Sequence, residues 1–276
     1  MATIQTTNEA CATCPVHNAA VLKKLGVDMS DYDFVIALAG NPNTGKSTVF
    51  NAITGLRQHT GNWPGKTVSR AEGGLAYGDQ KYKVVDLPGT YSLLATSLDE
   101  EVARDFILFG QPDVTIVVVD ATRLERNLNL VLQVTEITDR AIVALNLIDE
   151  AERHGLQIDE RRLAKDLGIP VVPLVARQGR GIPELLQAIS EVANGQTLGK
   201  LRKIKYDSPG LKNAIDQLTA KIEAGYPDLP NARWVALRLL DGDKKIAEAL
   251  KNGELGDLTY GNLEQRSSKL QVIGQQ

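Results

Sequence analysis

The chain has 276 residues, of which 43% are hydrophobic and 24% charged, and its formal net charge is −3. This composition is ordinary for a globular protein, and a pI near 5.7 gives no reason to expect nucleic acid as a partner. The first residues lack the basic and apolar segments of a secretory signal, and no stretch reaches the ~18 apolar residues of a membrane helix. Two cysteines cannot form a disulfide framework, so we expect a soluble intracellular chain of one or two domains.

The first 32 residues form a polar tail with one helical segment near Asn18–Leu25. Within it, Cys11, Cys14 and His17 have the spacing of ligands for Zn²⁺ or Fe²⁺. Only three ligands are present, so a metal site would need a fourth from a carboxylate, another histidine or another chain. The alternatives are redox or intermolecular pairing of the thiols and, as the polar context favours, a tail with unused thiols.

A phosphate-binding loop follows the apolar run Phe34–Ala39, which predicts a buried strand, and precedes the helical pattern Lys46–Thr54. Residues 40–47 match GxxxxGK[ST], in which glycines let backbone N–H groups surround phosphate oxygens at a helix N-terminus. Lys46 is expected to reach the β- and γ-phosphates, and the Ser47 hydroxyl to ligate Mg²⁺. The predicted nucleoside triphosphate site comprises Gly40, Asn41, Asn43, Thr44, Gly45, Lys46, Ser47 and Thr48.

A second motif, Asp86-Leu-Pro-Gly89, comes directly after the expected strand Lys81–Val85. In a nucleotide site Asp86 would hold the Mg²⁺ shell, and the Gly89 amide would contact the γ-phosphate. The same four residues could form a simple turn, but their place at a strand end beyond a phosphate loop favours the nucleotide role. Upstream, the alternating segment Thr67–Tyr77 and the turn signal Gly78-Asp79 predict an antiparallel strand pair.

Apolar runs continue to alternate with helical patterns up to about residue 195. The remaining strands are expected at Val114–Asp120, Ala141–Asn146 and Val171–Leu174, and the helices at Asp99–Phe109, Asn127–Thr138, Asp159–Leu167 and Ile182–Ala193. This alternation predicts an α/β fold with a mostly parallel sheet flanked by helices. Ligands of such a fold bind at the carboxyl ends of the strands, where the phosphate loop lies.

The third motif, Asn146-Leu-Ile-Asp149, stands at the end of an expected strand. The Asp149 carboxylate could accept both N–H donors of guanine, which favours guanine over adenine, although Asn and Asp are also common helix caps. A further base-binding loop is expected at Val175-Ala176-Arg177, before Gln178-Gly-Arg-Gly181, with Val175 and Ala176 as its nucleotide-binding residues. Val175 occupies a position where GTPases often have serine, so recognition there would rest on the Ala176 amide, and a relaxed NTPase or ATPase stays open.

The pattern changes after residue 195, where helices replace the alternation. Helices are expected at Ser208–Ala224, Asn231–Leu240, Lys244–Leu250 and Leu263–Val272, with one short strand at Leu201–Tyr206. They predict a small all-helical domain with Trp234 in its core. The basic segment Lys200–Lys205 is expected to be a solvated linker rather than a binding patch.

The order of these motifs resembles that of the translation-factor-related GTPases, and in detail the chain is similar to the cytosolic domain of the bacterial ferrous iron transport protein B (FeoB) family. The resemblance is carried by residues 40–51, 61–68, 86–92, 102–105 and 146–149, and it extends over about 33–195. The segment Asn62-Trp-Pro-Gly65 is its most specific part, because generic GTPases lack it. Beyond residue 195 the chain resembles the family only in being helical.

The resemblance implies a polar tail over 1–32, a GTP-binding G domain over 33–195 and a helical domain over 196–276 that links to a membrane region. It makes Thr67 the switch I residue that reaches Mg²⁺ and the γ-phosphate, within a switch spanning residues 57–68. Switch II would span residues 87–98. Asn43 would hold an activating K⁺, or would simply be a turn residue of the loop. No side-chain base follows Gly89, so catalysis is expected to rely on ions, backbone and positioning, with Lys46, Thr67 and Gly89 as the catalytic groups.

The implied function is hydrolysis of GTP to GDP, coupled through the helical domain to a membrane permease that begins where this sequence ends. The implied location is the cytoplasmic face of the bacterial inner membrane, and accessory proteins of the transporter and self-association are further expectations. An iron-transport context would strengthen the hypothesis that Cys11, Cys14 and His17 bind a metal ion. The alternative is a free-standing GTPase that acts on ribosomes or tRNA, which the acidic charge and Asn62–Gly65 argue against.

Overall fold

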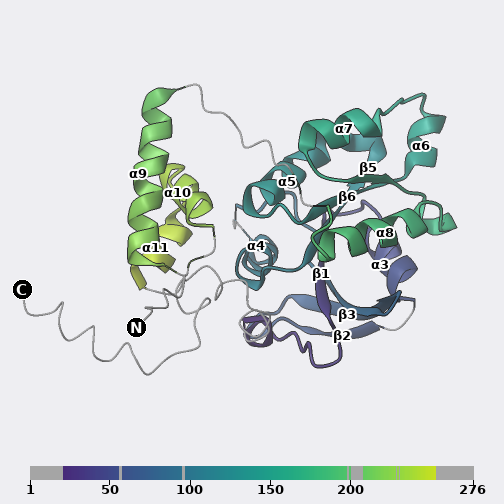
Figure 1. Cartoon of the computed structure of the whole chain (residues 1–276), viewed down its shortest axis with the longest axis horizontal. Coiled ribbons are helices and arrows are strands. Elements are labelled where there is room, and N and C mark those ends of the chain that lie inside the picture. Colours follow the sequence, from purple (N-terminus) through teal and green to yellow (C-terminus); the bar gives the residue numbers. More distant parts are fainter. Residues whose placement is uncertain are drawn as a thin grey trace, which may run out of the picture.

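The computed structural model describes residues 21–55, 58–94, 97–197, 199, 208–227, 229 and 231–252. A seven-stranded sheet in the order β2-β3-β4-β1-β5-β6-β7 forms its centre (Figure 1). The strands are β1 (Phe34–Gly40), β2 (Gln58–Asn62), β3 (Ser69–Tyr77), β4 (Gln80–Asp86), β5 (Val114–Asp120), β6 (Ala141–Asn146) and β7 (Val171–Pro173). The predicted mostly parallel sheet is confirmed, with β2, β3 and β4 paired antiparallel at one side.

The parallel register aligns the carboxyl ends of the central strands. Leu38 of β1 pairs with Asp86 of β4, and Gly40 pairs with Val118 of β5. Asp120 of β5 in turn pairs with Asn146 of β6. The phosphate loop and the residues predicted to bind magnesium and base therefore all leave the sheet at one edge.

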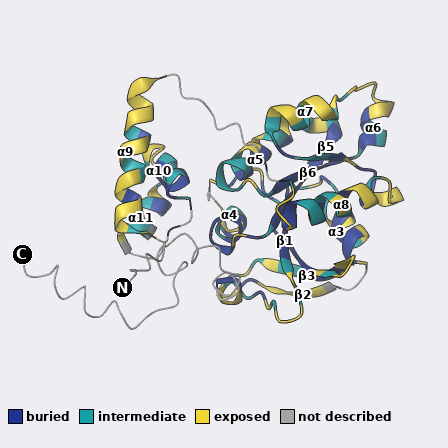
Figure 2. Cartoon of the chain, viewed as in Figure 1, coloured by how far each residue is buried: buried dark blue, intermediate teal, exposed yellow. Residues whose placement is uncertain are grey.

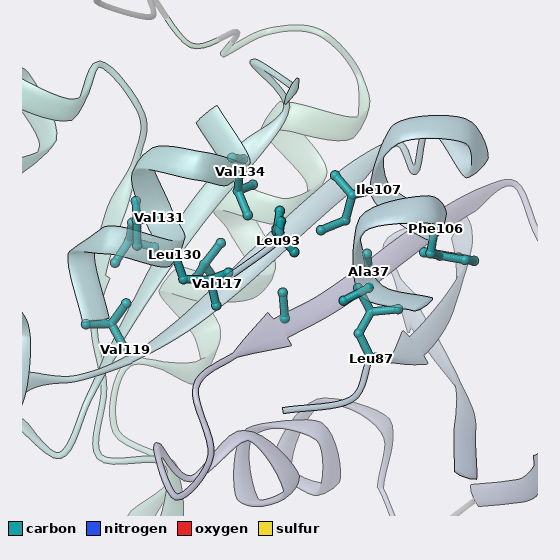
Figure 3. Close-up of a cluster of buried hydrophobic side chains, with 14 of the residues drawn as sticks. Ala37, Leu87, Leu93, Phe106, Ile107, Val117, Val119, Leu130, Val131 and Val134 are labelled. Atoms are coloured by element: carbon teal, nitrogen blue, oxygen red, sulfur yellow. The ribbon is translucent and has the colours of Figure 1, made fainter. Parts of the chain in front are cut away.

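Helices cover both faces of the sheet, as expected (Figures 1 and 2). They are α3 (Lys46–Thr54), α4 (Leu98–Gly110), α5 (Leu124–Ile137), α6 (Ile148–Arg153), α7 (Glu160–Leu167) and α8 (Ile182–Ala193), with single 3₁₀ turns η1 (Ala121–Arg123) and η2 (Ala176–Gln178). Phe50 of α3 and Leu185 of α8 belong to one buried cluster. Phe106 of α4 and Leu130 of α5 belong to another, on the opposite face (Figure 3).

The local sequence signals explain where several helices begin and end. The Ser97 side chain accepts a hydrogen bond from the Glu100 amide and caps α4, whose first turn carries the acids that favour a helix N-terminus. The Asp159 side chain caps α7, and Gly168 ends it in the left-handed conformation. Asp99 and Glu100 lie in the first turn of α4.

Two elements were not predicted. Residues 58–62 were expected to be part of the switch I loop but form the edge strand β2, which pairs antiparallel with β3 from Gln58↔Gly73 to Asn62↔Ser69. An edge strand with no buried face needs no apolar alternation, so the polar sequence gave no strand signal. The short helix α6 begins at Ile148, one residue after the left-handed Leu147 (φ 64°).

The helices α9 (Pro209–Gly225), α10 (Ala232–Leu240) and α11 (Lys244–Asn252) form the predicted C-terminal helical domain. Trp234 is buried there, as expected. A third buried cluster joins these helices to Leu108 and Phe109 of α4. The predicted strand Leu201–Tyr206 and helix Leu263–Val272 lie outside the described residues. Within the described part of the chain, no helix combines the length and apolar character that crossing a bilayer requires.

Candidate nucleotide-binding site

The phosphate loop connects β1 to α3 through a tight turn. Asn43 (φ 66°) and Gly45 (φ 82°) both adopt left-handed backbone conformations. The Thr44 hydroxyl donates to the Asn41 carbonyl over 2.9 Å, which closes the loop on itself. Only glycine fits at position 45, because a Cβ there would collide with the Asn146 side chain. The loop therefore directs backbone N–H groups at one point, the arrangement that binds phosphate.

Lys46 and Asp86 form an ion pair at the open end of this loop. Burial raises the pKa of Asp86, while the charge and hydrogen bond of Lys46 act to lower it. Ser47 and Thr48, the next residues of α3, are exposed. Lys46, which was predicted to contact the phosphates, is thus paired with Asp86, which was predicted to bind Mg²⁺.

Asn41 lies within the loop and is only 3% exposed. Neither its amide nitrogen nor its side-chain oxygen has a hydrogen-bond partner among the described residues. Its backbone carbonyl accepts the Thr44 hydroxyl, so the residue contributes to the turn through its main chain.

The DxxG segment runs alongside the phosphate loop. The Leu87 amide donates to the Leu38 carbonyl over 3.0 Å, and the Thr90 amide donates to the Gly40 carbonyl over 3.2 Å. A Cβ on Gly89 would lie 3.4 Å from the Pro42 backbone, so the two segments are in close contact. A cleft of about 530 Å³ opens beside them and is lined by Thr67, Val68, Ser69, Pro88, Gly89, Ser97, Leu98 and Asp99. The structure thus brings Thr67 and Gly89, predicted from separate motifs, to one cleft.

Thr67 belongs to the hairpin loop between β2 and β3, which Trp63 fixes to the core. Trp63 is 4% exposed, and its ring meets the Phe106 ring edge-on at 5.4 Å between centroids. Its amide donates to the Val68 carbonyl over 3.0 Å and closes the loop. Lys66 Nζ lies 2.7 Å from Glu101 Oε1 of α4. The Trp-Pro-Gly segment was predicted only as a family signature, but its tryptophan anchors the loop between β2 and β3.

On the base side of the site, Asn146 joins three segments. Its amide nitrogen donates to the Thr44 carbonyl over 3.0 Å, and its side-chain oxygen accepts the Ala176 amide over 3.1 Å. Val175 is buried, and its amide donates to the Arg180 carbonyl over 3.0 Å. The predicted phosphate and base loops therefore lie side by side. Of the two predicted base-loop residues, Ala176 bonds Asn146.

Asp149 follows on α6 and pairs with Arg177, a residue of the predicted base-binding loop to which no role was assigned. Burial of the carboxyl acts to raise the pKa of Asp149, but the hydrogen bond and charge of Arg177 outweigh it, and the pKa is lowered. Asp149 Oδ2 takes the Arg177 bond, while Oδ1 is buried and has no partner within the described residues. The position of Arg177 directly after Ala176 was the one signal available in the sequence.

The predicted metal ligands fall into two groups. Cys11, Cys14 and His17 lie outside the described residues. Within those that are described, no three His, Cys, Asp or Glu side chains gather into a metal site. Ser47 and Asp86 offer the hydroxyl and carboxylate oxygens that suit Mg²⁺, which commonly binds one or two protein oxygens together with nucleotide phosphates.

Comparison with known families matches nearly the whole described chain. Residues 34–189 match the family model for ferrous iron transport protein B, and residues 208–271 match that of the FeoB cytosolic helical domain. The Fe(2+) transporter FeoB of Escherichia coli K12 is 45% identical over 212 residues, which is 75% of this chain and 27% of that protein. The chain thus spans about a quarter of the length of the curated relatives that it matches.

Two solved structures are similar over most of the chain. The cytosolic domain of Legionella pneumophila FeoB has 35% identity and a TM-score of 0.72, covering 83% of this chain and 90% of its own. The cytosolic domain of the Thermotoga maritima FeoB iron transporter in a GMPPNP form has 36% identity and a TM-score of 0.71, covering 84% of this chain and 89% of its own.

Proposed function

Because this chain belongs to the ferrous iron transport protein B family, we propose that it binds GTP and hydrolyses it to GDP as the cytosolic regulatory part of a ferrous iron transporter. The observation that carries the proposal is Asn146, whose side chain bonds both the phosphate loop at Thr44 and the base loop at Ala176. One residue thereby fixes the distance between a triphosphate cradle and a carboxylate, Asp149, that is suited to guanine.

In this proposal the backbone of residues 40–48 holds the phosphates, and Lys46 leaves Asp86 to contact their oxygens. Mg²⁺ would be held by Ser47, Thr67 and Asp86, and its charge would stabilise negative charge on the phosphate oxygens. The Gly89 amide would donate a hydrogen bond to the γ-phosphate. K⁺ beside Asn43 would supply the positive charge that other GTPases import as an arginine.

Turnover of GTP and of ATP by one preparation tests the activity. We expect GTP to be preferred, because Asp149 matches the two N–H donors of guanine, which adenine lacks. Lys46→Ala should slow GTP hydrolysis by about a hundredfold or more, the usual loss when one charged contact to the transition state is removed. Lys81→Ala, an exposed lysine on β4, is the matched control and should leave turnover unchanged. A marked preference for ATP would refute the assignments of Asn146 and Asp149.

The ions are tested separately. Chelation of Mg²⁺ should stop hydrolysis, because Lys46 and K⁺ would not replace the divalent charge that Ser47, Thr67 and Asp86 are proposed to hold against the phosphate oxygens. Replacing K⁺ by Na⁺ should slow it if Asn43 holds potassium, since Na⁺ is smaller and prefers a tighter ligand shell. Equal rates in the two salts would rule out the role of Asn43.

The transport role concerns the longer protein. We propose that residues 33–195 act as the G domain and 196–276 as a helical connection, after a tail over 1–32. The switch state would pass through the helices to a permease at the cytoplasmic face of the inner membrane, with accessory proteins and self-association as further partners. Support comes from the family match and from the buried cluster that joins α4 to the C-terminal helices.

A further inference from the structure

Arg177 is the residue of the base side that neither the motifs nor the family assignment explains. It belongs to η2, directly after Ala176, and its guanidinium bonds Asp149 Oδ2 on α6. η2 also contacts the end of β6, where the Ala176 amide donates to Asn146 Oδ1. The side chain of Arg177 is 52% exposed, so burial does not force this pairing.

The two oxygens of Asp149 are not equivalent. Oδ2 faces Arg177 and, at 3.5 Å, Arg153 from its own helix. Oδ1 is buried and accepts no hydrogen bond from the described residues. Glu150, the other charged neighbour, pairs with the same arginines at 3.6 and 3.8 Å. Oδ2 is therefore held by Arg177, whereas Oδ1 has no partner within the described chain and is covered, so a bound base would have to uncover it.

A carboxylate has about four lone-pair positions, so Oδ2 can keep Arg177 and still accept one further donor. Guanine presents two neighbouring donors, the ring N1–H and the 2-amino group. Two donors require both oxygens in one fixed plane, whereas a single donor can follow a carboxylate that rotates. A carboxylate fixed at one oxygen is thus suited to a base with two donors.

We propose that Arg177 is a positioning residue that sets the selectivity of the site for the 2-amino group of guanine, by fixing the plane of the Asp149 carboxylate. The inference rests on the proposed guanine-nucleotide function. The opposite arrangement, in which Arg177 competes with the base for Asp149, predicts tighter binding when the arginine is removed.

The test compares the affinities of GDP and inosine diphosphate, which lacks only the 2-amino group, for the parent chain and for Arg177→Ala. We expect Arg177→Ala to weaken GDP about tenfold, the size of one charge-assisted hydrogen bond, and to change inosine diphosphate less than about twofold. The preference for GDP should therefore fall. Arg177→Lys keeps a positive charge near Asp149 Oδ2, so it should retain part of the preference for GDP over inosine diphosphate.

Arg180→Ala is the matched control, because Arg180 lies on the same loop, is 62% exposed and pairs with Glu152 rather than with Asp149. It should leave both affinities unchanged. The pH profile gives a second measurement. Without Arg177, only the charge of Arg153 and the Glu150 amide would oppose burial, so the pKa of Asp149 would rise. As the pH is lowered, GDP affinity should therefore begin to fall at a higher pH than in the parent. A purely structural defect would lower affinity equally at every pH.

Tighter GDP binding by Arg177→Ala would overturn the inference, as would equal weakening of both nucleotides with an unchanged pH profile. Either result would leave the proposed function intact, provided that the parent prefers GDP to inosine diphosphate and to ADP. A parent chain with no such preference would overturn both the guanine assignment and the role of Arg177.

Discussion

Asp113 shows how a single half-buried carboxyl makes the stability of this chain depend on pH. It precedes β5, and its Oδ2 accepts the Val35 amide over 2.8 Å. Partial burial raises the pKa of Asp113 above the ordinary aspartate value of 3.8, although the Val35 amide and Arg140 act to lower it. The folded carboxyl binds a proton more readily than the unfolded one. Its contribution to stability is thus fully present below the unfolded pKa and is lost as pH rises through the folded pKa.

We therefore expect Asp113→Asn to be more stable than the parent at neutral pH, because asparagine keeps an oxygen for the Val35 amide and cannot ionise. The gain should disappear once the pH falls below the ordinary aspartate pKa of 3.8. Urea unfolding followed by circular dichroism across this range measures it. Identical stability of the two proteins at every pH would contradict the assignment.

Also at the residue scale, the sequence predicts the roles of single motif residues better than it predicts which distant side chains contact each other. Lys46, Asp86 and Asn146 stand in local motifs, and the spacing within each motif is enough to suggest a role. The Arg177–Asp149 pair joins residues 28 positions apart, and only the parallel order of β6 and β7 brings them together. Asn41, a residue of the predicted loop, has a buried amide without a partner in the described chain, which no spacing rule would indicate.

At the scale of elements, the loop between β2 and β3 depends on Trp63. Trp63→Ala should lower the free energy of unfolding by about 3–5 kcal/mol, because a large buried ring is lost. Trp63→Phe should cost about 1–2 kcal/mol, since it keeps an aromatic ring against Phe106 and the buried indole nitrogen has no hydrogen-bond partner among the described residues. Chemical denaturation followed by circular dichroism distinguishes the two. Equal losses would mean that the ring does not anchor the loop.

Most helices and strands were predictable because their periodicity reflects burial. The central strands β5 and β6 are buried at every position and mostly apolar, as expected for a sheet covered on both faces. β2 was missed because an exposed edge strand leaves no such trace. Its pairing depends on backbone bonds to β3, which the sequence of residues 58–62 does not encode.

At the scale of the whole molecule, Asn231 connects the two halves of the chain. Its amide nitrogen donates to the carbonyls of Glu136 and Ile137, at the end of α5, over 2.8 and 3.0 Å. Its oxygen accepts the Trp234 amide and caps α10. The residue has φ 53°, so glycine can replace it without backbone strain.

Asn231→Gly should therefore lower the free energy of unfolding by about 1–3 kcal/mol through lost hydrogen bonds alone. Asn231→Asp keeps the cap but sets a carboxylate against the carbonyl oxygens of α5, so it should be destabilised at least as much. Thermal unfolding measures both, together with whether the helices still melt in one transition with the sheet. An unchanged midpoint for both variants would show that the connection between the halves depends on the apolar cluster alone.

The anchored hairpin loop has a consequence for how far Thr67, the proposed contact of the γ-phosphate, can travel. Thr67 is two residues from Ser69, the first residue of β3, and four from the buried Trp63. A fully extended chain spans about 3.3–3.6 Å per residue, so these tethers limit Thr67 to about 7 Å from Ser69 and about 14 Å from Trp63. While Ser69 and Trp63 keep their positions, any movement of Thr67 in response to nucleotide would stay within these distances. A rearrangement of the preceding strand β2 would not extend them.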